Sequence, residues 1–366
     1  MKRVWWAQIE AVIRLELRKT FFARRGLWIY FLALLPVLLF VGYSIANSYQ
    51  LKQSSSVARH GEKKLTYQDL LAIHSDMTKE EVIAALGKPP VVFHWEDRKD
   101  DESSKPSVTP HEEYRYSDGV NDLYLSLADG KVESIHLQEG YNLGRDSIMF
   151  AGVFQFFFLR LAVFFGCLGI FMNLFRGEIL DRSLHFYFLA PVRREVLMVG
   201  KFLAGLIATS VIFVTSELLQ NVAFLWHLSP AVRDLYLYQN HGLEHALVYL
   251  GVTMLACVGY GAFFIVAGML FKNPILPTAA ILIWEGINPF LPALLKQFSV
   301  IYYLKALCPV NIPAPPDMSP VMGLLISDPN PISPFLAIAG LLIVAAIALY
   351  GSSLQVRRME INYTTE

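Results

Sequence analysis

Two histidines and a glutamate at residues 241–245 have a spacing that could bind a metal ion. The run HGLEH follows the H-x-x-E-H pattern, in which two histidines one helical turn apart hold zinc and the glutamate acts as general base. A zinc site needs a third protein ligand, for which His227 and Asp234 are the nearby candidates. Gly242 also weakens a helix at this point. We therefore favour a polar interfacial loop here, and we expect no catalytic residue and no metal site in this chain.

A charged segment at residues 176–201, RGEILDRSLHFYFLAPVRREVLMVGK, separates two long apolar runs. Four ionisable residues recur at three- and four-residue spacings, as on a short helix: Glu178, Asp181, Arg182 and His185. Pro191 interrupts the chain, and Arg193 and Arg194 then precede the next apolar run. An ordinary positively charged cytoplasmic loop is the simpler interpretation. The length and the order of the charges favour a surface that another cytosolic protein contacts.

The same segment ends in Gly200-Lys201, which does not make a nucleotide site. A phosphate-binding loop needs an upstream glycine and a hydroxyl residue after the lysine, and both are missing here. No Gly-x-x-x-x-Gly-Lys-Ser/Thr sequence occurs elsewhere in the chain. We therefore expect that the chain is not an enzyme and does not hydrolyse ATP.

Three ionisable residues fall inside apolar runs: Arg160, Glu217 and Glu285. Charges at membrane depth are costly, so each is a candidate for a functional role. Pairing of Arg160 with Glu217 would neutralise both, whereas Glu285 could line a cavity near the external end. Structural pairing and a place in a transport pathway both stay open for these residues.

The elements that position these residues are expected to be membrane helices. The composition is 54% hydrophobic and only 17% charged, which is typical of a membrane protein. Six runs are long enough to cross a hydrocarbon core, which takes about 20 residues as a helix. They are residues 27–48, 148–175, 202–227, 246–271, 275–295 and 335–354. The fifth is interrupted by Pro277, Pro289 and Pro292.

Basic residues give the expected orientation. With the N-terminus inside, 15 Lys and Arg residues lie in the cytoplasmic pieces and three in the short external loops: Arg233, Lys296 and Lys305. Both ends of the chain are therefore expected in the cytosol. Within residues 1–26, an amphipathic helix with aromatic and basic residues is predicted to lie in the inner membrane interface, unless it simply extends the first span.

Residues 51–147 are expected to form a small α+β domain outside the membrane, between spans 1 and 2. They hold 12 Lys/Arg and 18 Asp/Glu, a net charge of −6, which argues against nucleic-acid binding. Helices are predicted at 66–74 and 78–86, the second starting at a Thr78–Glu81 capping box. Strands follow at 91–95, 113–116, 122–127 and 132–137, with a turn at Asp129-Gly130 and a mobile loop at 97–110.

Residues 298–334 form a second external piece that is rich in proline. Its tyrosines and prolines suggest short re-entrant or interfacial helices joined by rigid turns.

Part of the external domain resembles the SmpA/OmlA fold of small envelope lipoproteins. The pattern is Ile73-x-x-x-Met77-Thr78-x-x-x-Val82-x-x-x-Leu86-Gly87-x-Pro89, followed by a β-meander. Asp76 departs from the glycine usual before the Met-Thr pair. In that family the module contacts proteins and is not a catalyst. The resemblance implies that an envelope protein docks on this domain.

The charged segment resembles the "E…D-R/K-T/S-L…P-x-x-R…GK" signature of ABC-2 type exporter permeases. The matching residues are Glu178, Asp181, Arg182, Ser183, Leu184, Pro191, Arg193, Arg194, Gly200 and Lys201. The resemblance extends over the membrane part, with its interfacial N-terminal helix, six spans and external re-entrant segment. It implies that residues 178–189 are a coupling helix seated in a separate ATPase.

This resemblance implies a multi-pass permease in the inner membrane of a bacterium, which pairs with an identical or related permease subunit amid membrane lipids. Two partner ATPase subunits would bind ATP and Mg²⁺, with no cofactor held by this chain. Its ATPase-coupling residues would be Glu178, Asp181, Arg182, His185, Pro191, Arg193, Arg194 and Lys201. The alternative is a membrane receptor or envelope-assembly factor that does not transport and works through the external domain.

Overall fold

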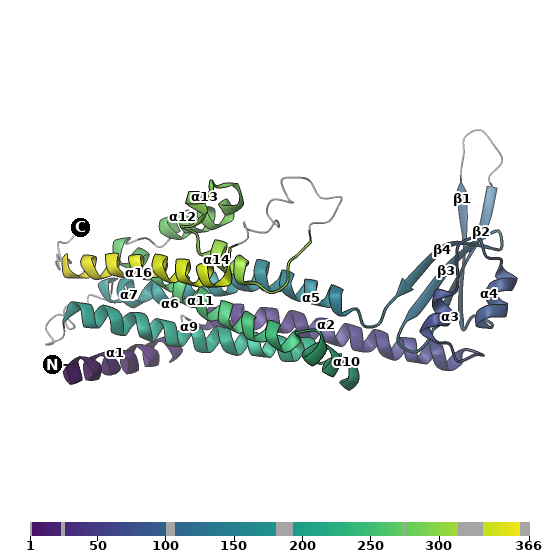
Figure 1. Ribbon diagram of the computed structural model, residues 1–366, viewed down its shortest axis with the longest axis horizontal. Helices are drawn as coiled ribbons and strands as arrows, with labels where there is room; N and C mark the ends of the chain where they lie inside the picture. The colour runs from purple at the N-terminus through teal and green to yellow at the C-terminus, as the bar shows by residue number, and fades with distance from the viewer. Residues whose placement is uncertain are drawn as a thin grey trace. The chain divides into compact units, whose positions relative to one another are not determined.

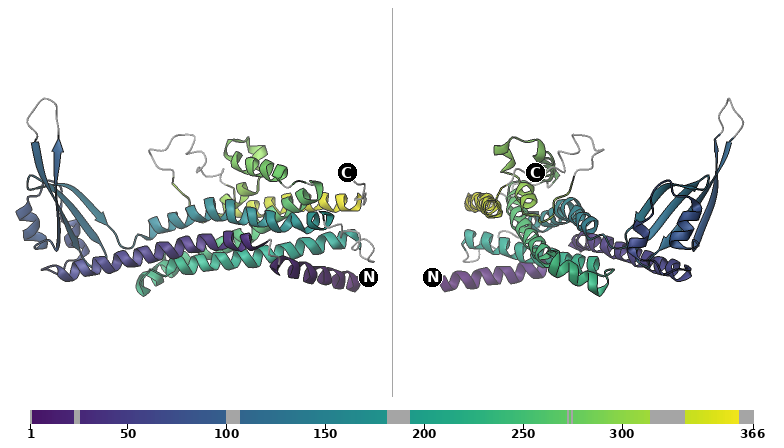
Figure 2. Two further views of the ribbon diagram at one scale, coloured as in Figure 1. Left: turned by 180° about the vertical axis from the view of Figure 1, so that it is seen from behind. Right: turned by 45° about the vertical axis from the view of Figure 1, so that its right-hand side comes forward.

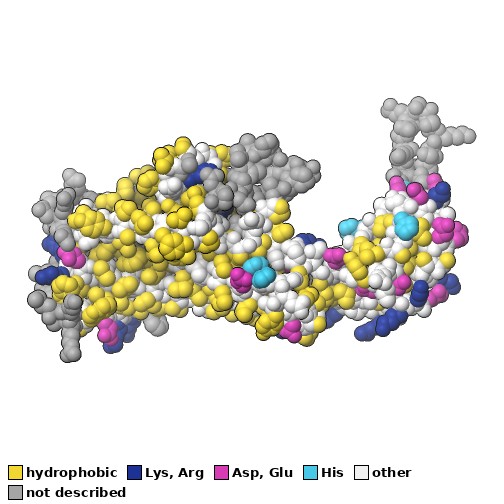
Figure 3. Space-filling model, in the orientation of Figure 1, with side chains coloured by type: hydrophobic (Ala, Val, Ile, Leu, Met, Phe, Trp, Pro, Cys, Tyr) yellow, Lys and Arg dark blue, Asp and Glu magenta, His cyan; other side chains and the backbone are white. Residues whose placement is uncertain are grey.

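The computed structural model describes residues 2–22, 26–99, 107–180, 193–271, 273, 275–313 and 332–358. The chain divides into two compact units (Figure 1). The helical unit comprises Met1–Phe40, Arg145–Phe224 and Leu235–Glu366, and the sheet unit comprises Val41–Gly144 and Leu225–Asp234. On the face drawn in Figure 3, hydrophobic side chains cover much of the helical unit.

Five helical stretches among the described residues are long and apolar enough to cross a membrane. They are Leu27–His60, Leu143–Gly177, Arg194–Leu225, Gly242–Leu270 and Pro334–Val356. The first stretch is α2 (Leu27–His60). The second consists of four consecutive elements: α5 (Leu143–Gly152), η2 (Val153–Val163), α6 (Phe164–Phe171) and α7 (Asn173–Leu180). The last three are α9 (Arg194–Leu225), α11 (Gly242–Leu270) and α16 (Pro334–Arg358). Five of the six predicted spans are therefore confirmed as helices of sufficient length, which indicates a multi-pass membrane protein.

The predicted fifth span is wrong as one continuous helix. Residues 275–295 form α12 (Ile275–Gly286), the 3₁₀ turn η4 (Asn288–Phe290) and the start of α13 (Ala293–Lys296). Pro289 and Pro292 lack backbone N–H groups and end the helical hydrogen bonding. Twelve residues of α12 span about 18 Å, which is too short for the hydrocarbon core.

A short buried helix follows in the predicted re-entrant segment. Helix α14 (Val300–Leu307) packs between α11 and α16. A methyl group at Gly259 would lie 2.8 Å from Val300, and one at Gly340 would lie 2.5 Å from the Tyr303 ring. Small residues therefore let α14 approach both neighbours closely. The rest of the predicted re-entrant segment, from 314 to 331, lies outside the described residues.

In the interior of the helical unit, aromatic rings pack directly against glycine residues of neighbouring helices. The ring of Phe171 on α6 lies directly against Gly205 on α9 and Gly261 on α11, where an added Cβ would clash with it. Phe213 of α9 fills the same kind of hollow at Gly166. The second apolar stretch contains an unusual element, because η2 is π-helical over 11 residues. This conformation is rare in proteins, and where it occurs it is often at a functional site.

The N-terminal region forms the predicted helix, α1 (Lys2–Phe22). Two short elements, α10 (Pro230–Asp234) and the π-helical η3 (Leu235–Gln239), connect α9 to α11. Figure 2 shows α1 beside α9 in both views.

The sheet unit contains a four-stranded antiparallel meander in the order β1-β2-β3-β4. Its strands are β1 (Val91–Lys99), β2 (Ser107–Ser117), β3 (Asp122–Ala128) and β4 (Lys131–Gln138). β1 and β2 extend well into residues 97–110, which were predicted to be a loop, because their backbones pair through to Lys99 and Ser107. All four predicted strands and the Asp129-Gly130 turn are confirmed, and both turn residues have positive φ.

Helices α3 (Tyr67–Leu71) and α4 (Lys79–Leu86) cover one face of this sheet. The predicted capping box is present, since Thr78 accepts from the Glu81 amide and Glu81 accepts from the Thr78 amide. The shared core is formed by Leu65, Leu70, Ile73, Val82, Leu86, Tyr114, Tyr116, Leu123, Leu125, Leu127 and Val132. Lys79 also ties α4 to β2 by donating to Glu112 at 2.7 Å, and this hydrogen bond lowers the pKa of the Glu112 carboxyl.

The backbone before α4 is fastened to the β3–β4 hairpin. Asp76 donates to the Val132 carbonyl at 3.0 Å, and the Val132 amide donates to the Met77 carbonyl at 2.9 Å. Asp76 has a φ of +74°, in the left-handed region that glycine adopts without strain. This conformation explains why glycine suits the position in the pattern that the segment resembles.

Replacement of Asp76 by glycine is expected to stabilise the sheet unit by about 0.5–1 kcal/mol, because it removes the strain of a left-handed non-glycine residue. Glu80 is the control: it is exposed in the first turn of α4, so Glu80→Gly is expected to destabilise by up to about 1 kcal/mol. Hydrogen exchange of residues 76–86 in the full chain measures both effects. Faster exchange in Asp76→Gly than in the wild type would contradict the strain at this residue.

Candidate functional site

A buried ion pair joins three helices of the helical unit where the charged segment begins and ends. Lys201 of α9 is completely buried, and its ammonium donates to Glu16 of α1 at 2.6 Å. It also donates to the carbonyl of Leu174 on α7 at 2.8 Å, and it lies 5.3 Å from the centre of the Phe175 ring. Glu16 is only 3% exposed. We call this arrangement of α1, α7 and α9 the Lys201 junction.

The local sequence lets the helices approach closely enough for this contact. A methyl group at Gly200 would lie 2.9 Å from the Val12 side chain, so α1 lies directly against α9 at this glycine. Seven residues earlier, just before α9 begins, the guanidinium of Arg193 lies 5.0 Å from the centre of the Trp5 ring. This cation–π contact adds a third attachment between the two helices.

Lys201 is therefore an interior residue, whereas the resemblance to exporter permeases implied that it takes part in coupling to an ATPase. A side chain without exposed surface acts on another subunit only through the helices that it holds. Arg193 is exposed and Arg194 begins α9. Glu178 lies on α7 without a described side chain, and Asp181, Arg182, His185 and Pro191 lie outside the described residues.

Glu16 was not recognised as a candidate from the sequence. The amphipathic pattern contained the signal, because Glu16 follows Ile9 and Val12 by seven and four residues and so shares their apolar face. A carboxylate on the packed face of a helix needs a buried partner. The basic residue that meets it is 185 positions away, so the pair itself is not visible in the pattern.

Glu285, which was predicted as a possible cavity residue, contacts the start of α14. One carboxylate oxygen accepts from the Val300 amide, and the other accepts from the Ile301 amide and the Ser299 hydroxyl, all at 2.9 Å. The buried carboxylate thereby satisfies the free N–H groups at the start of α14. This contact fixes the short helix against the end of α12.

The pairing of Arg160 with Glu217, which the sequence left open, is not formed in this structure. Glu217 is buried and accepts from Asn221 at 3.0 Å, whereas the Arg160 guanidinium lies over the Phe156 ring at 5.3 Å. Similar depth along two spans does not fix the direction in which each side chain points. A place for either residue in a transport pathway stays a prediction.

The HGLEH run does not form a metal cluster with other described residues. His241 has a φ of +57° and precedes α11, and its ring nitrogen lies 3.0 Å from the Glu244 carboxylate. Within the described ranges, no group of three His, Cys, Asp or Glu side chains is placed to hold a metal ion. In this structure the run forms a local contact between His241 and Glu244 at the start of α11.

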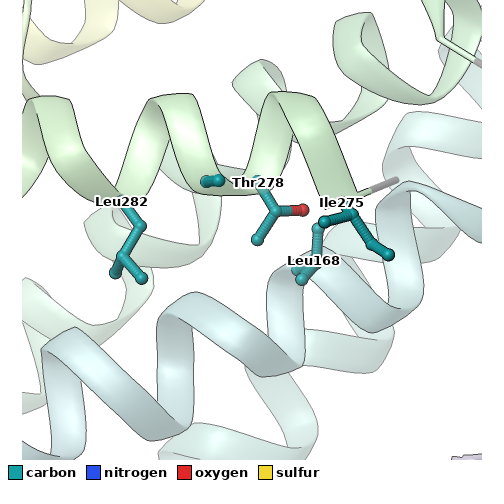
Figure 4. A pocket seen from close by; sticks show the side chains of 5 residues that line it. Leu168, Ile275, Thr278 and Leu282 are labelled. Carbon is teal, nitrogen blue, oxygen red and sulfur yellow. The ribbon is translucent and has the colours of Figure 1, made fainter. Parts of the chain in front are cut away.

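Two cavities of the helical unit are almost wholly apolar. One, of about 310 Å³, lies between α6 and α12 and is lined by Leu168, Ile275, Thr278, Ala279 and Leu282 (Figure 4). The other, of about 340 Å³, lies between α2 and α9, with Tyr30, Thr215 and Ser216 as its polar residues. Neither brings together groups for acid–base or nucleophilic chemistry.

No protein-family model matches this chain, and no curated protein matches it.

Removal of the Glu16 charge is expected to destabilise the helical unit by about 3–5 kcal/mol, because it leaves the Lys201 ammonium buried without its carboxylate. The test compares Glu16→Gln with Glu10→Gln on the same helix by equilibrium unfolding in mixed micelles. Glu10 pairs with Arg14 at 3.2 Å, but both side chains are exposed, so its loss is expected to cost less than about 1 kcal/mol. Equal effects of the two substitutions would contradict the Lys201 junction.

Proposed function

We propose that this chain is the membrane-spanning permease subunit of an ATP-driven exporter, working as a pair of permeases with two separate ATPase subunits. The observation that supports this most is the Lys201 junction. The segment that resembles a coupling helix runs between α7 and α9, and Lys201 links these two helices to each other and to α1.

Such a junction suits the transfer of force from a cytosolic motor. A push on residues 181–192 would reach α7 at one end and α9 at the other. Because the Lys201 ammonium holds both α1 and the Leu174 carbonyl, the three helices would move together. Coupling requires contacts that differ between two states, and rigid attachment of this kind lets a contact at the surface bias the whole helical unit.

The nucleotide chemistry belongs to the partner in this proposal. ATP and Mg²⁺ would be bound by the ATPase subunits, since the chain has no phosphate-binding loop. This chain would supply the membrane pathway and the cytosolic contact.

Reversal of the charges at Glu178, Arg193 and Arg194 is expected to abolish co-purification of the ATPase and the stimulation of its turnover by cargo. Charge reversal at an interface places like charges together and costs several kcal/mol. Lys296→Glu is the control, because this residue lies on α13 and is predicted to be outside the cell. Unchanged ATPase binding and coupling in the triple variant would overturn the exporter function.

A second candidate function, a receptor or assembly factor, is favoured by the outer face of the sheet. Phe93 and Trp95 on the edge strand β1 are 55% and 43% exposed. These residues would suit contact with an envelope protein. The charge-reversal experiment separates the functions, since a receptor would lose no activity when residues 178 and 193–194 are changed.

A further inference from the structure

The two edges of the sheet differ in how their backbones are covered. The strand order β1-β2-β3-β4 leaves β1 and β4 at the edges (Figure 1). The edge of β4 is closed where the strand begins, because the Asp76 amide donates to the Val132 carbonyl and the Val132 amide donates to the Met77 carbonyl. Over residues 91–95 of β1, by contrast, every backbone pairing among the described residues is to β2. This stretch therefore presents an open row of backbone donors and acceptors.

The sequence of this edge lacks the features that normally keep an edge strand from pairing. Exposed edges in natural sheets usually carry lysine, proline or a bulge. Residues 91–95 are VVFHW, and their register with β2 runs without a shift. Among them Val92, Phe93 and Trp95 are exposed hydrophobic residues. An open and apolar strand edge of this kind is a template for an added strand.

The Trp95 ring marks where a side chain of an added strand would lie. Trp95 pairs in register with His111 of β2, and their rings are stacked with centroids 5.5 Å apart and planes 7° from parallel. His111 therefore covers one face of the indole, and the other face is turned away from β2. A side chain on a strand paired with β1 would extend this cross-strand stack. Phe93 lies two residues earlier and so points to the same face of the sheet as Trp95.

The charge around this edge favours a cationic occupant. The aromatic residues of β1 share their sheet face with Glu113, which is the register partner of Phe93. On the same face, Glu133 of β4 lies 3.7 Å from the His111 ring. Residues 51–147 as a whole hold 12 Lys/Arg and 18 Asp/Glu, a net charge of −6. Exposed aromatic rings beside carboxylates attract arginine and lysine through cation–π contact and charge complementarity.

We propose that β1 binds an extended segment of another protein as an additional strand, with arginine or lysine at the alternate positions that face Phe93 and Trp95. The residues between them would lie on the face of Val92 and be apolar. Backbone hydrogen bonds to residues 91–95 would supply affinity, and the alternating side chains would supply selectivity. This binding does not depend on the exporter function. As the partner of a receptor, the segment rests on the second candidate function above.

The test is the binding of a fluorescent octapeptide, which alternates arginine and valine, to the full-length protein in non-ionic detergent micelles. Fluorescence anisotropy is expected to rise in a saturable way with the protein and not with empty micelles. The same peptide with every backbone amide N-methylated is expected to bind at least about tenfold more weakly, because strand pairing loses its donors. A peptide that alternates glutamate and valine is expected not to bind. Equal binding of either control peptide would overturn the proposal.

Variants of the edge locate the binding. Phe93→Lys places on β1 the residue that protects natural edge strands, and it is expected to weaken peptide binding at least about tenfold. Leu71→Lys is the matched control: Leu71 on α3 is 54% exposed and Phe93 is 55% exposed, so the same charge is added away from β1. Trp95→Ala is expected to weaken binding about threefold to tenfold, because it removes the cation–π contact. Undiminished binding in Phe93→Lys and Trp95→Ala would refute the site.

Two further outcomes separate the occupants and the functions. If the protein without peptide forms a dimer that Phe93→Lys dissociates, the edge belongs to a second copy of this chain and the proposal fails. Peptide binding without any coupled ATPase would keep the β1 site and remove the exporter function. A coupled ATPase without peptide binding would remove the β1 site and leave the exporter function.

Discussion

The burial of the Lys201 ammonium is the constraint on which the packing of α1, α7 and α9 in the helical unit depends. A charge taken out of water costs several kcal/mol unless an opposite charge and further hydrogen bonds replace the water. Here the replacement comes from Glu16 on α1 and the Leu174 carbonyl on α7, with the Phe175 ring beside them. All three helices must be in register at once for the charge to be satisfied, and Gly200 supplies the close approach that makes this geometry attainable.

The need to satisfy a buried charge also distinguishes two kinds of polar residue inside the helical unit. Glu285 is satisfied by the amides at the start of α14, so its charge fixes a helix that is only eight residues long. Arg160 and Tyr260 instead retain buried donors without acceptors. A buried charge that the protein's own groups satisfy holds the architecture together, whereas a buried donor without an acceptor adds no such contact. That difference, and not depth in the membrane alone, is the reason to assign a structural role to Glu285.

Sequence patterns predicted the structural features that are decided by residues close together in the chain. Runs of apolar residues predicted five helices that are long enough to cross a membrane, and the Thr78–Glu81 capping box and the Asp129-Gly130 turn predicted parts of the sheet unit, because each is decided within a few residues. The predicted fifth span is not one helix because Pro289 and Pro292, which are visible in the sequence, end the helical hydrogen bonding after α12. The Arg160–Glu217 pairing and the missed Glu16–Lys201 pair share another cause: the direction of a side chain and its distant partner are set by helix rotation and packing, which composition does not encode.

The most direct test of this account is a double-mutant cycle between positions 16 and 201. Glu16→Met, Lys201→Met and the double variant would be compared with the wild type by equilibrium unfolding in micelles. If the two side chains form one buried unit, each single variant is strongly destabilised and the double variant much less than their sum, with a coupling energy of about 2 kcal/mol or more. Additive effects would contradict the junction, and with it the proposal that α1, α7 and α9 move together.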